Sequence, residues 1–222
     1  MTDFAAARLN MIESQVRPNG ITDHRIIAAM ASLAREDFVP AWRRAVAYMD
    51  GDVALGEAGQ GREGRYMIEA MAFAKLVHLA AIKAQDRILH VGAATGYGSA
   101  VLAQLGASVT ALESNADLAA KARKNLEGRP GIAVAEGALA DGWKPAAPYD
   151  VIVVEGRIAE VPASLLGQLA DGGRLVAVVG DGEVAKAQLV TASGTSAAVR
   201  SAFDASVAAL PGFTRKKPAF VF

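Results

Sequence analysis

In the second half of the chain, short continuous apolar runs alternate with segments in which apolar residues recur at helical spacing. Five such runs, at 87–91, 108–113, 132–136, 150–155 and 174–179, predict buried strands. Apolar residues recur at helical spacing over 98–105, 116–126 and 162–169, between those strands. Strands that alternate with helices in this way predict a mostly parallel sheet covered by helices on both faces.

The first 84 residues lack this rhythm and are dominated by helical spacing. Helices are predicted over 4–17, 23–34 and 67–83, and Thr22 and Asp23 are suitable caps for the second of them. The glycine-rich stretch 43–65 predicts loops with at most a short hairpin. We therefore expect an N-terminal region, 1–84, packed on an α/β core, 85–222, within one compact domain.

The end of the chain returns to strands, predicted at 189–192, 199–205 and 219–222, with a turn at Pro211 and Gly212. No helix separates the last two, so these strands are expected to form an antiparallel edge of the sheet. The terminal run RKKPAFVF fits a strand at an interface between subunits as well as it fits an edge strand of the sheet, so the oligomeric state stays open.

Composition excludes several classes of function. Lys+Arg and Asp+Glu are equal at 23 each, so no net field attracts the chain to nucleic acid or to an anionic membrane. The chain has no cysteine, and its three histidines are scattered, so no metal site is expected. No run resembles a signal peptide or is long enough to span a bilayer, which indicates a cytoplasmic enzyme or binding protein.

A glycine turn follows the first strand of the predicted core. Gly92, Gly96 and Gly98 lie between that strand and the next helix, and Glu113 ends the second strand about 20 residues later. An acid at that distance typically binds the ribose hydroxyls of a nucleotide-like cofactor. The glycine order differs from the dinucleotide pattern and is nearer the looser turn of S-adenosylmethionine-dependent methyltransferases. A glycine turn also occurs in many α/β proteins that bind nothing there.

Three longer runs resemble the protein-L-isoaspartate O-methyltransferase family over nearly the whole chain. They are GITDHRIIAAMASLAREDFVPAWRRAVAYMD at 20–50, GEAGQG at 56–61 and GALADGWKPAAPYDVIVVEGRIAEVPASLLGQLADGGRLVAVVG at 137–180. The resemblance implies a Rossmann-like methyltransferase fold, S-adenosyl-L-methionine as the cofactor, and methylation of isoaspartyl carboxylates for protein repair. The positions that it assigns to the cofactor are His90, Gly92, Ala94, Gly96, Glu113, Ser114, Gly137 and Ala138.

Several of these positions depart from the family pattern. His90 replaces an acid, Ala94 replaces a glycine, and Ala138 replaces an aspartate that contacts the adenine in the family. His90 is interpreted either as a hydrogen-bonding substitute for the acid or as a contact to the methionine part of the cofactor.

The family's substrate loop departs further. Its Ser-x-Pro segment aligns with MIEA, which places Ile68 at the serine and Ala70 at the proline, and no catalytic residue is assigned. Ile68 cannot donate a hydrogen bond to a carboxylate. Arg62 and Arg65 are alternative carboxylate ligands, although loop arginines are more often simply solvated.

Three hypotheses follow. The first is an isoaspartyl O-methyltransferase acting on a peptide or protein carboxylate. The second keeps the fold and the cofactor but methylates another acceptor, such as a small molecule, or serves as a binding or regulatory module. The third, a nicotinamide-dependent oxidoreductase, agrees with Glu113 but not with the glycine spacing.

Overall fold

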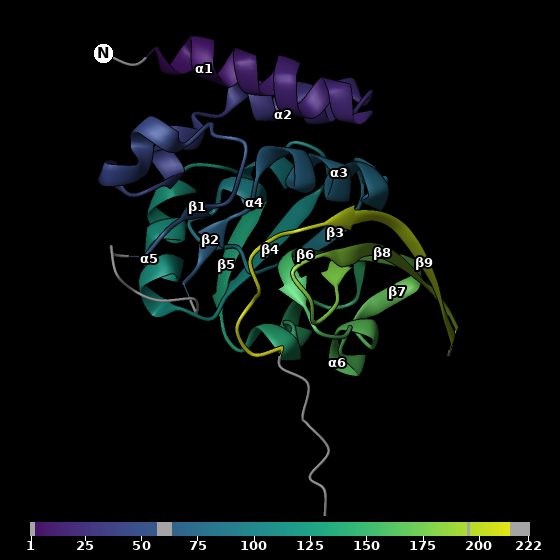
Figure 1. The fold of residues 1–222 in the computed structure, drawn as a ribbon. Helices are drawn as coiled ribbons and strands as arrows, with labels where there is room; N and C mark the ends of the chain where they lie inside the picture. The colour runs from purple at the N-terminus through teal and green to yellow at the C-terminus, as the bar shows by residue number, and fades with distance from the viewer. Residues whose placement is uncertain (1–2, 57–63, 195, 214–222) are drawn as a thin grey trace, which may run out of the picture.

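The core is a seven-stranded sheet in the order β5-β4-β3-β6-β7-β8-β9 (Figure 1). A computed structural model describes residues 3–56, 64–194 and 196–213. Its strands are β3 Arg87–Val91, β4 Ser108–Glu113, β5 Ile132–Glu136, β6 Tyr149–Ile158, β7 Leu169–Val179, β8 Ala185–Ser193 and β9 Ser196–Ala205. The first five of these are parallel, and β8 and β9 are antiparallel, which confirms the predicted sheet and its antiparallel edge. The strand predicted at 219–222 lies outside the described residues.

The central strands β3, β4 and β6 follow the predicted apolar runs because both of their faces are covered. Against one face pack the N-terminal helices together with α3 Ala70–Ala80, α4 Tyr97–Leu102 and α5 Ala116–Asn125. Against the other pack the short 3-10 helices η5 Leu139–Asp141 and η6 Lys144–Ala146, the helix α6 Ala163–Leu166, and the segment around Leu210. α4 and α6 are shorter than the helices predicted at 98–105 and 162–169.

The N-terminal region forms a layer of short helices above α3 (Figure 1). Its elements are α1 Phe4–Met11, η1 Ile12–Val16, η2 Arg17–Asn19, α2 His24–Ser32, η3 Arg35–Phe38, η4 Ala41–Val46 and the antiparallel pair β1 Val53–Ala54 and β2 Tyr66–Met67. Asp23 caps α2 by accepting a hydrogen bond from the Arg25 backbone N–H at 2.9 Å, as its position before the helix predicted. No helix in the described part of the chain is long and apolar enough to cross a membrane.

The helix predicted over 67–83 is wrong at both ends. Met67 belongs to β2, where it pairs with Val53, and Glu69 is extended at ψ 147°. The helical apolar spacing in this stretch therefore begins inside a strand, because pairing with β1 overrides the local pattern. α3 ends where Ala81 takes the left-handed conformation at φ 48°.

The buried Arg35 and the partly buried Asp52 join this layer to the core. Arg35 is 1% exposed; its Nε donates to the Ala47 carbonyl at 2.8 Å and its Nη2 to the Ile68 carbonyl at 2.7 Å. Its guanidinium also lies 4.8 Å from the centre of the Tyr97 ring. The Asp52 carboxylate accepts a hydrogen bond from the Glu69 N–H at 2.9 Å. It accepts a second from the N–H of Ala208, in the C-terminal segment, at 2.7 Å. Burial raises the pKa of the Asp52 carboxyl, against the effect of these two backbone donors.

Tyr48 is the centre of a polar network that fixes α1 to η3. Its hydroxyl donates to the Glu36 carboxylate and accepts from Arg8 Nε at 3.0 Å and from the Arg35 backbone N–H at 3.2 Å. Burial and then the Glu36 carboxylate raise the pKa of Tyr48 to about 12. The phenol is therefore bound in its neutral form.

We predict that Tyr48→Phe lowers the free energy of unfolding by about 1–3 kcal/mol at neutral pH, because Glu36 and Arg8 lose a buried partner. A raised pKa means that this stabilisation is fully present below the ordinary value of 10.0 and is lost as pH rises through about 12. Urea unfolding of the parent and of Tyr48→Phe, from neutral pH up to pH 12, measures the difference between their free energies of unfolding. A difference that stays constant up to pH 12 would contradict the proposed network.

Candidate active site

Three ionisable side chains lie on one face of the sheet, at the carboxyl ends of three adjacent strands. His90 in β3 pairs with Ala111 in β4 and with Val153 in β6. Side chains alternate along a strand, so Glu113 and Glu155, each two residues further on, share the face of His90. Ligands of open α/β sheets bind at such an edge, where the strand order reverses. The sequence predictions included His90 and Glu113 and missed Glu155.

Glu113 is completely buried and all of its acceptor positions are used. Oε1 accepts from the backbone N–H groups of Ser114 and Asn115, both at 2.9 Å. Oε2 accepts from the Ala94 N–H at 2.8 Å and from Arg65 Nη2 at 2.8 Å. One carboxylate thus connects β4, the glycine turn, the start of α5 and the residue that precedes β2.

The Arg65 contact corrects the expectation that this arginine is a solvated loop charge. Its side chain is 8% exposed, and its partner is a carboxylate of the chain itself. An isolated buried guanidinium would be costly, so the pairing with Glu113 explains its burial. Arg62, the other candidate, lies outside the described residues.

The glycine turn has three residues with positive φ: Gly92 at 84°, Ala94 at 51° and Gly96 at 97°. Ala94 therefore holds a left-handed conformation that favours glycine, at the position where the sequence departs from the family pattern. Its N–H bond to Glu113 offsets part of this cost. A side chain at Gly92 would meet Leu210, whose Cδ2 would stand 2.9 Å from the added Cβ. The C-terminal segment thus encloses the turn.

His90 is fully buried and both ring nitrogens have a neighbour. Nδ1 lies 2.8 Å from the Ser99 hydroxyl oxygen, and Nε2 lies 2.8 Å from Oε2 of Glu155. Only the Ser99 contact is a hydrogen bond; Nε2 and Oε2 lie close together without hydrogen-bond geometry. Glu155, on the adjacent strand β6, is 4% exposed.

Gly98 makes room for this pair. A Cβ at Gly98 would collide with Oε2 of Glu155 and would stand 2.7 Å from Cε1 of His90 and 3.0 Å from the Phe73 ring. The glycine requirement here comes from side-chain packing, since Gly98 has an ordinary helical backbone in α4.

The remaining predicted positions lie at the ends of β4 and β5. Ser114 and Ala138 are exposed and Gly137 is partly exposed. The Trp143 ring stands beside Gly137, 3.5 Å from where a Cβ would be. Tyr97 packs against Phe38, Phe73 and Arg35 in the core rather than facing this edge.

At the substrate-loop position, Ile68 is 1% exposed and only its backbone carbonyl makes a polar contact, with Arg35. Ala70 begins α3. These two residues therefore belong to the core. Among the described residues, no group of three or more metal-ligating side chains is placed to hold an ion.

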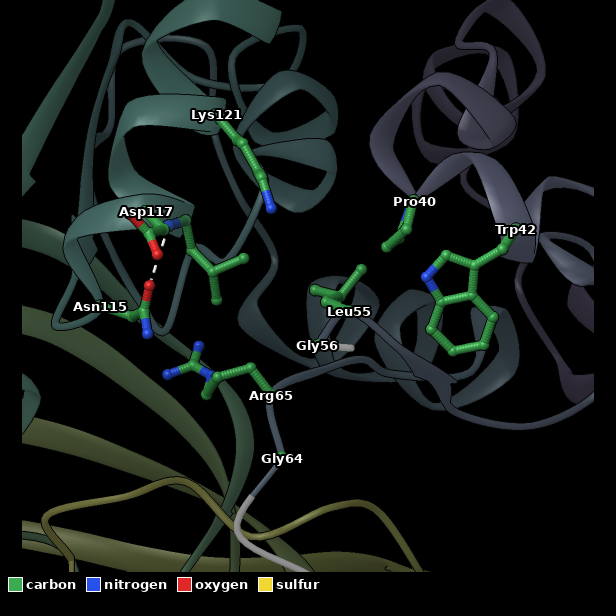
Figure 2. A pocket seen from close by; sticks show the side chains of 10 residues that line it. Pro40, Trp42, Leu55, Gly56, Gly64, Arg65, Asn115, Asp117 and Lys121 are labelled. Carbon is green, nitrogen blue, oxygen red and sulfur yellow. Dashed lines mark hydrogen bonds between the residues drawn. The ribbon is translucent and has the colours of Figure 1, made fainter. Parts of the chain in front are cut away.

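A cavity of about 430 Å³ adjoins Glu113 on the side of α5. Figure 2 shows Asn115, Asp117 and Lys121 along one wall, Pro40 and Trp42 along the opposite wall, and Arg65 between them. Sequence reasoning missed this cavity because its walls come from segments far apart in the chain.

Comparison with known proteins agrees with this geometry. A family model described as Protein-L-isoaspartate(D-aspartate) O-methyltransferase matches residues 7–210. A protein-L-isoaspartate O-methyltransferase of Methanoculleus marisnigri is 43% identical over 178 residues, which cover 79% of this chain and 78% of the relative. A protein-L-isoaspartate O-methyltransferase of Methylorubrum populi is 43% identical over 182 residues, which cover 81% of this chain and 82% of the relative.

The chain belongs to the protein-L-isoaspartate(D-aspartate) O-methyltransferase family. A solved structure of a protein-L-isoaspartate O-methyltransferase superposes with a TM-score of 0.78, at 21% identity, over 93% of this chain and 67% of that one. A putative family member from Plasmodium falciparum, in complex with S-adenosyl-L-homocysteine, has a TM-score of 0.75 at 17% identity, covering 96% of this chain and 100% of that one. These likenesses confirm the predicted fold.

The residues at this edge fit the methyl donor of the family. Glu113 places two carboxylate oxygens beside the backbone of the turn, where a ribose is expected, and the Arg65 side chain is the donor on them that a hydroxyl would have to replace. Gly92 and Gly96 have no side chain, so the backbone there would lie close to the donor. Ser114 and Ala138 are exposed, which leaves room for the adenine ring of the donor between them. Glu155 places a carboxylate oxygen 2.8 Å from the His90 ring.

We predict that Gly98→Ala destabilises the protein by about 1–3 kcal/mol through overpacking against Glu155, His90 and Phe73. Gly51→Ala is the matched control, because a Cβ there would meet only the end of Met49 at 3.5 Å. Chemical denaturation of the two variants and the parent measures the effect. Equal stability of the two variants would show that the Glu155 side chain is not where the structure has it.

Proposed function

We propose that this protein transfers a methyl group from S-adenosyl-L-methionine to the side-chain carboxylate of isoaspartyl residues in peptides or proteins, a repair reaction in the cytoplasm. The named relatives at about 40% identity support the reaction. The observation that carries the proposal is the buried Glu113 carboxylate, held beside the glycine turn at the carboxyl end of β4.

The reaction needs alignment more than acid–base chemistry. A carboxylate with a pKa of about 4 is already ionised at neutral pH, so no general base has to remove a proton. When bound, S-adenosylmethionine supplies a methyl group on a sulfonium. The rate then depends on how well donor and acceptor are held in line and shielded from water.

Each part of the chain has a role in that alignment. Glu113 would hold the ribose hydroxyls, and the backbone from Gly92 to Gly96 would follow the donor closely. Leu210 closes the turn against Gly92 and so excludes water from that side. The His90–Glu155 pair keeps a carboxylate beneath the turn.

The buried Ile68 supports a second candidate, transfer to a different acceptor. The family's serine at this position would present a hydroxyl, whereas Ile68 is 1% exposed and presents none. The donor site would be unchanged under this alternative.

We predict that Glu113→Gln weakens the binding of S-adenosylhomocysteine by about 10- to 100-fold, because hydrogen bonds to a charged acceptor are lost. Glu127→Gln, an exposed position beyond α5, is the matched control and should bind like the parent. Isothermal titration calorimetry measures the affinities, and thermal unfolding checks that each variant is folded. If the parent releases no heat at millimolar ligand, the donor site is disproved.

We predict base-labile methyl ester formation on an isoaspartyl peptide and none on the aspartyl peptide of the same sequence. The rate should vary little between pH 6 and 8, because the acceptor is ionised throughout that range. Transfer of a radiolabelled methyl group measures both. Donor binding without transfer to the isoaspartyl peptide would select the alternative acceptor.

A further inference from the structure

Arg65 occupies the position on Glu113 that the donor requires. The four nitrogen donors around Glu113 leave neither oxygen free for a ribose hydroxyl. Three of these donors are backbone N–H groups fixed by the turn and by the start of α5. Arg65 is the only side chain among these four nitrogen donors, and the Ser114 hydroxyl makes only a long contact of 3.5 Å to the other oxygen, so Arg65 is the partner that can leave.

The cavity beside Glu113 provides a second place for the guanidinium. Arg65 lines this cavity, and its Nη1 is buried without a hydrogen-bond partner among the described residues. The side chain is more than nine-tenths buried, so an unpaired N–H there is costly. Figure 2 shows the guanidinium directed toward Asn115 and the ammonium group of Lys121 directed into the same space.

We infer that Arg65 couples the two substrates: it holds Glu113 until the donor ribose replaces it, and it then binds the carboxylate of the acceptor in this cavity together with Lys121. This inference rests on the proposed function. It gives the isoaspartyl site a charged ligand in place of the hydroxyl that is absent at Ile68.

The cavity has the chemistry of a peptide carboxylate site. Arg65 and Lys121 supply two cations, and a guanidinium binds a carboxylate with two parallel hydrogen bonds. Pro40, Trp42 and Leu55 form an apolar wall suited to the flanking peptide. Asp117, in the first turn of α5, is the acidic residue of the lining and offsets part of the charge of the two cations.

Coupling of this kind is reciprocal. An acceptor that draws Arg65 into the cavity frees Glu113 and must tighten donor binding by the same factor by which the donor tightens acceptor binding. Removal of Arg65 frees Glu113 permanently, so the donor no longer competes with an internal cation.

Calorimetric titration of the full chain with S-adenosylhomocysteine tests this, with and without a saturating isoaspartyl peptide. In the parent, the peptide should tighten S-adenosylhomocysteine binding by about 3- to 10-fold. Arg65→Met should bind S-adenosylhomocysteine more tightly than the parent by a similar factor, show no effect of the peptide, and have a raised KM for the peptide. Arg44→Met is the matched control, because Arg44 pairs with Asp37 at the surface and makes no contact with Glu113. It should retain the parent's donor affinity and coupling.

A parent whose S-adenosylhomocysteine affinity is unchanged by the peptide would overturn the inference, and this result requires no variant to fold. So would an Arg65→Met protein that keeps the parent's coupling. These outcomes differ from failure of the proposed function, in which the parent binds no S-adenosylhomocysteine at all.

Discussion

The Glu113 carboxylate is the contact on which the site depends. It is fully buried, and it accepts hydrogen bonds from Ala94 in the glycine turn, from Ser114 and Asn115 before α5, and from Arg65 before β2. A charge this deep is tolerated only when every lone pair has a partner. The same requirement positions the turn, the first residues of α5 and the hairpin relative to one another, and these are the parts that a methyl donor would contact.

The His90–Glu155 pair places a second buried carboxylate in the cluster that contains Glu113. His90 stands where the family has an acid, yet Glu155 on the neighbouring strand places a carboxylate 2.8 Å from its ring. The pair fits because Gly98 has no side chain in the space that Glu155 occupies. The buried cluster at this strand end therefore contains a carboxylate, on β6 rather than on β3.

The sequence predicted most of the fold and only part of the site. β3 and β4 begin and end where their apolar runs do, because burial on both faces leaves a clear pattern. Glu155 ends the predicted strand 150–155 as Glu113 ends 108–113, but it was missed because only the strand order places it beside His90. The ion pair of Arg65 joins residues 48 positions apart, so its loop context indicated solvent exposure where the fold buries it. Strand pairing with β1 likewise displaced the start of α3.

The most direct test of this account is an NMR spectrum of the Arg65 side-chain N–H groups, without and with S-adenosylhomocysteine. A guanidinium held by a buried carboxylate gives a protected, shifted resonance, which the Arg65→Met spectrum identifies. The account predicts that this resonance moves as the ligand saturates, together with the amide signals of Ala94, Ser114 and Asn115. Saturation that moves the amide signals and leaves the Arg65 resonance unchanged would contradict it, because the donor would then share Glu113 with Arg65 instead of replacing it.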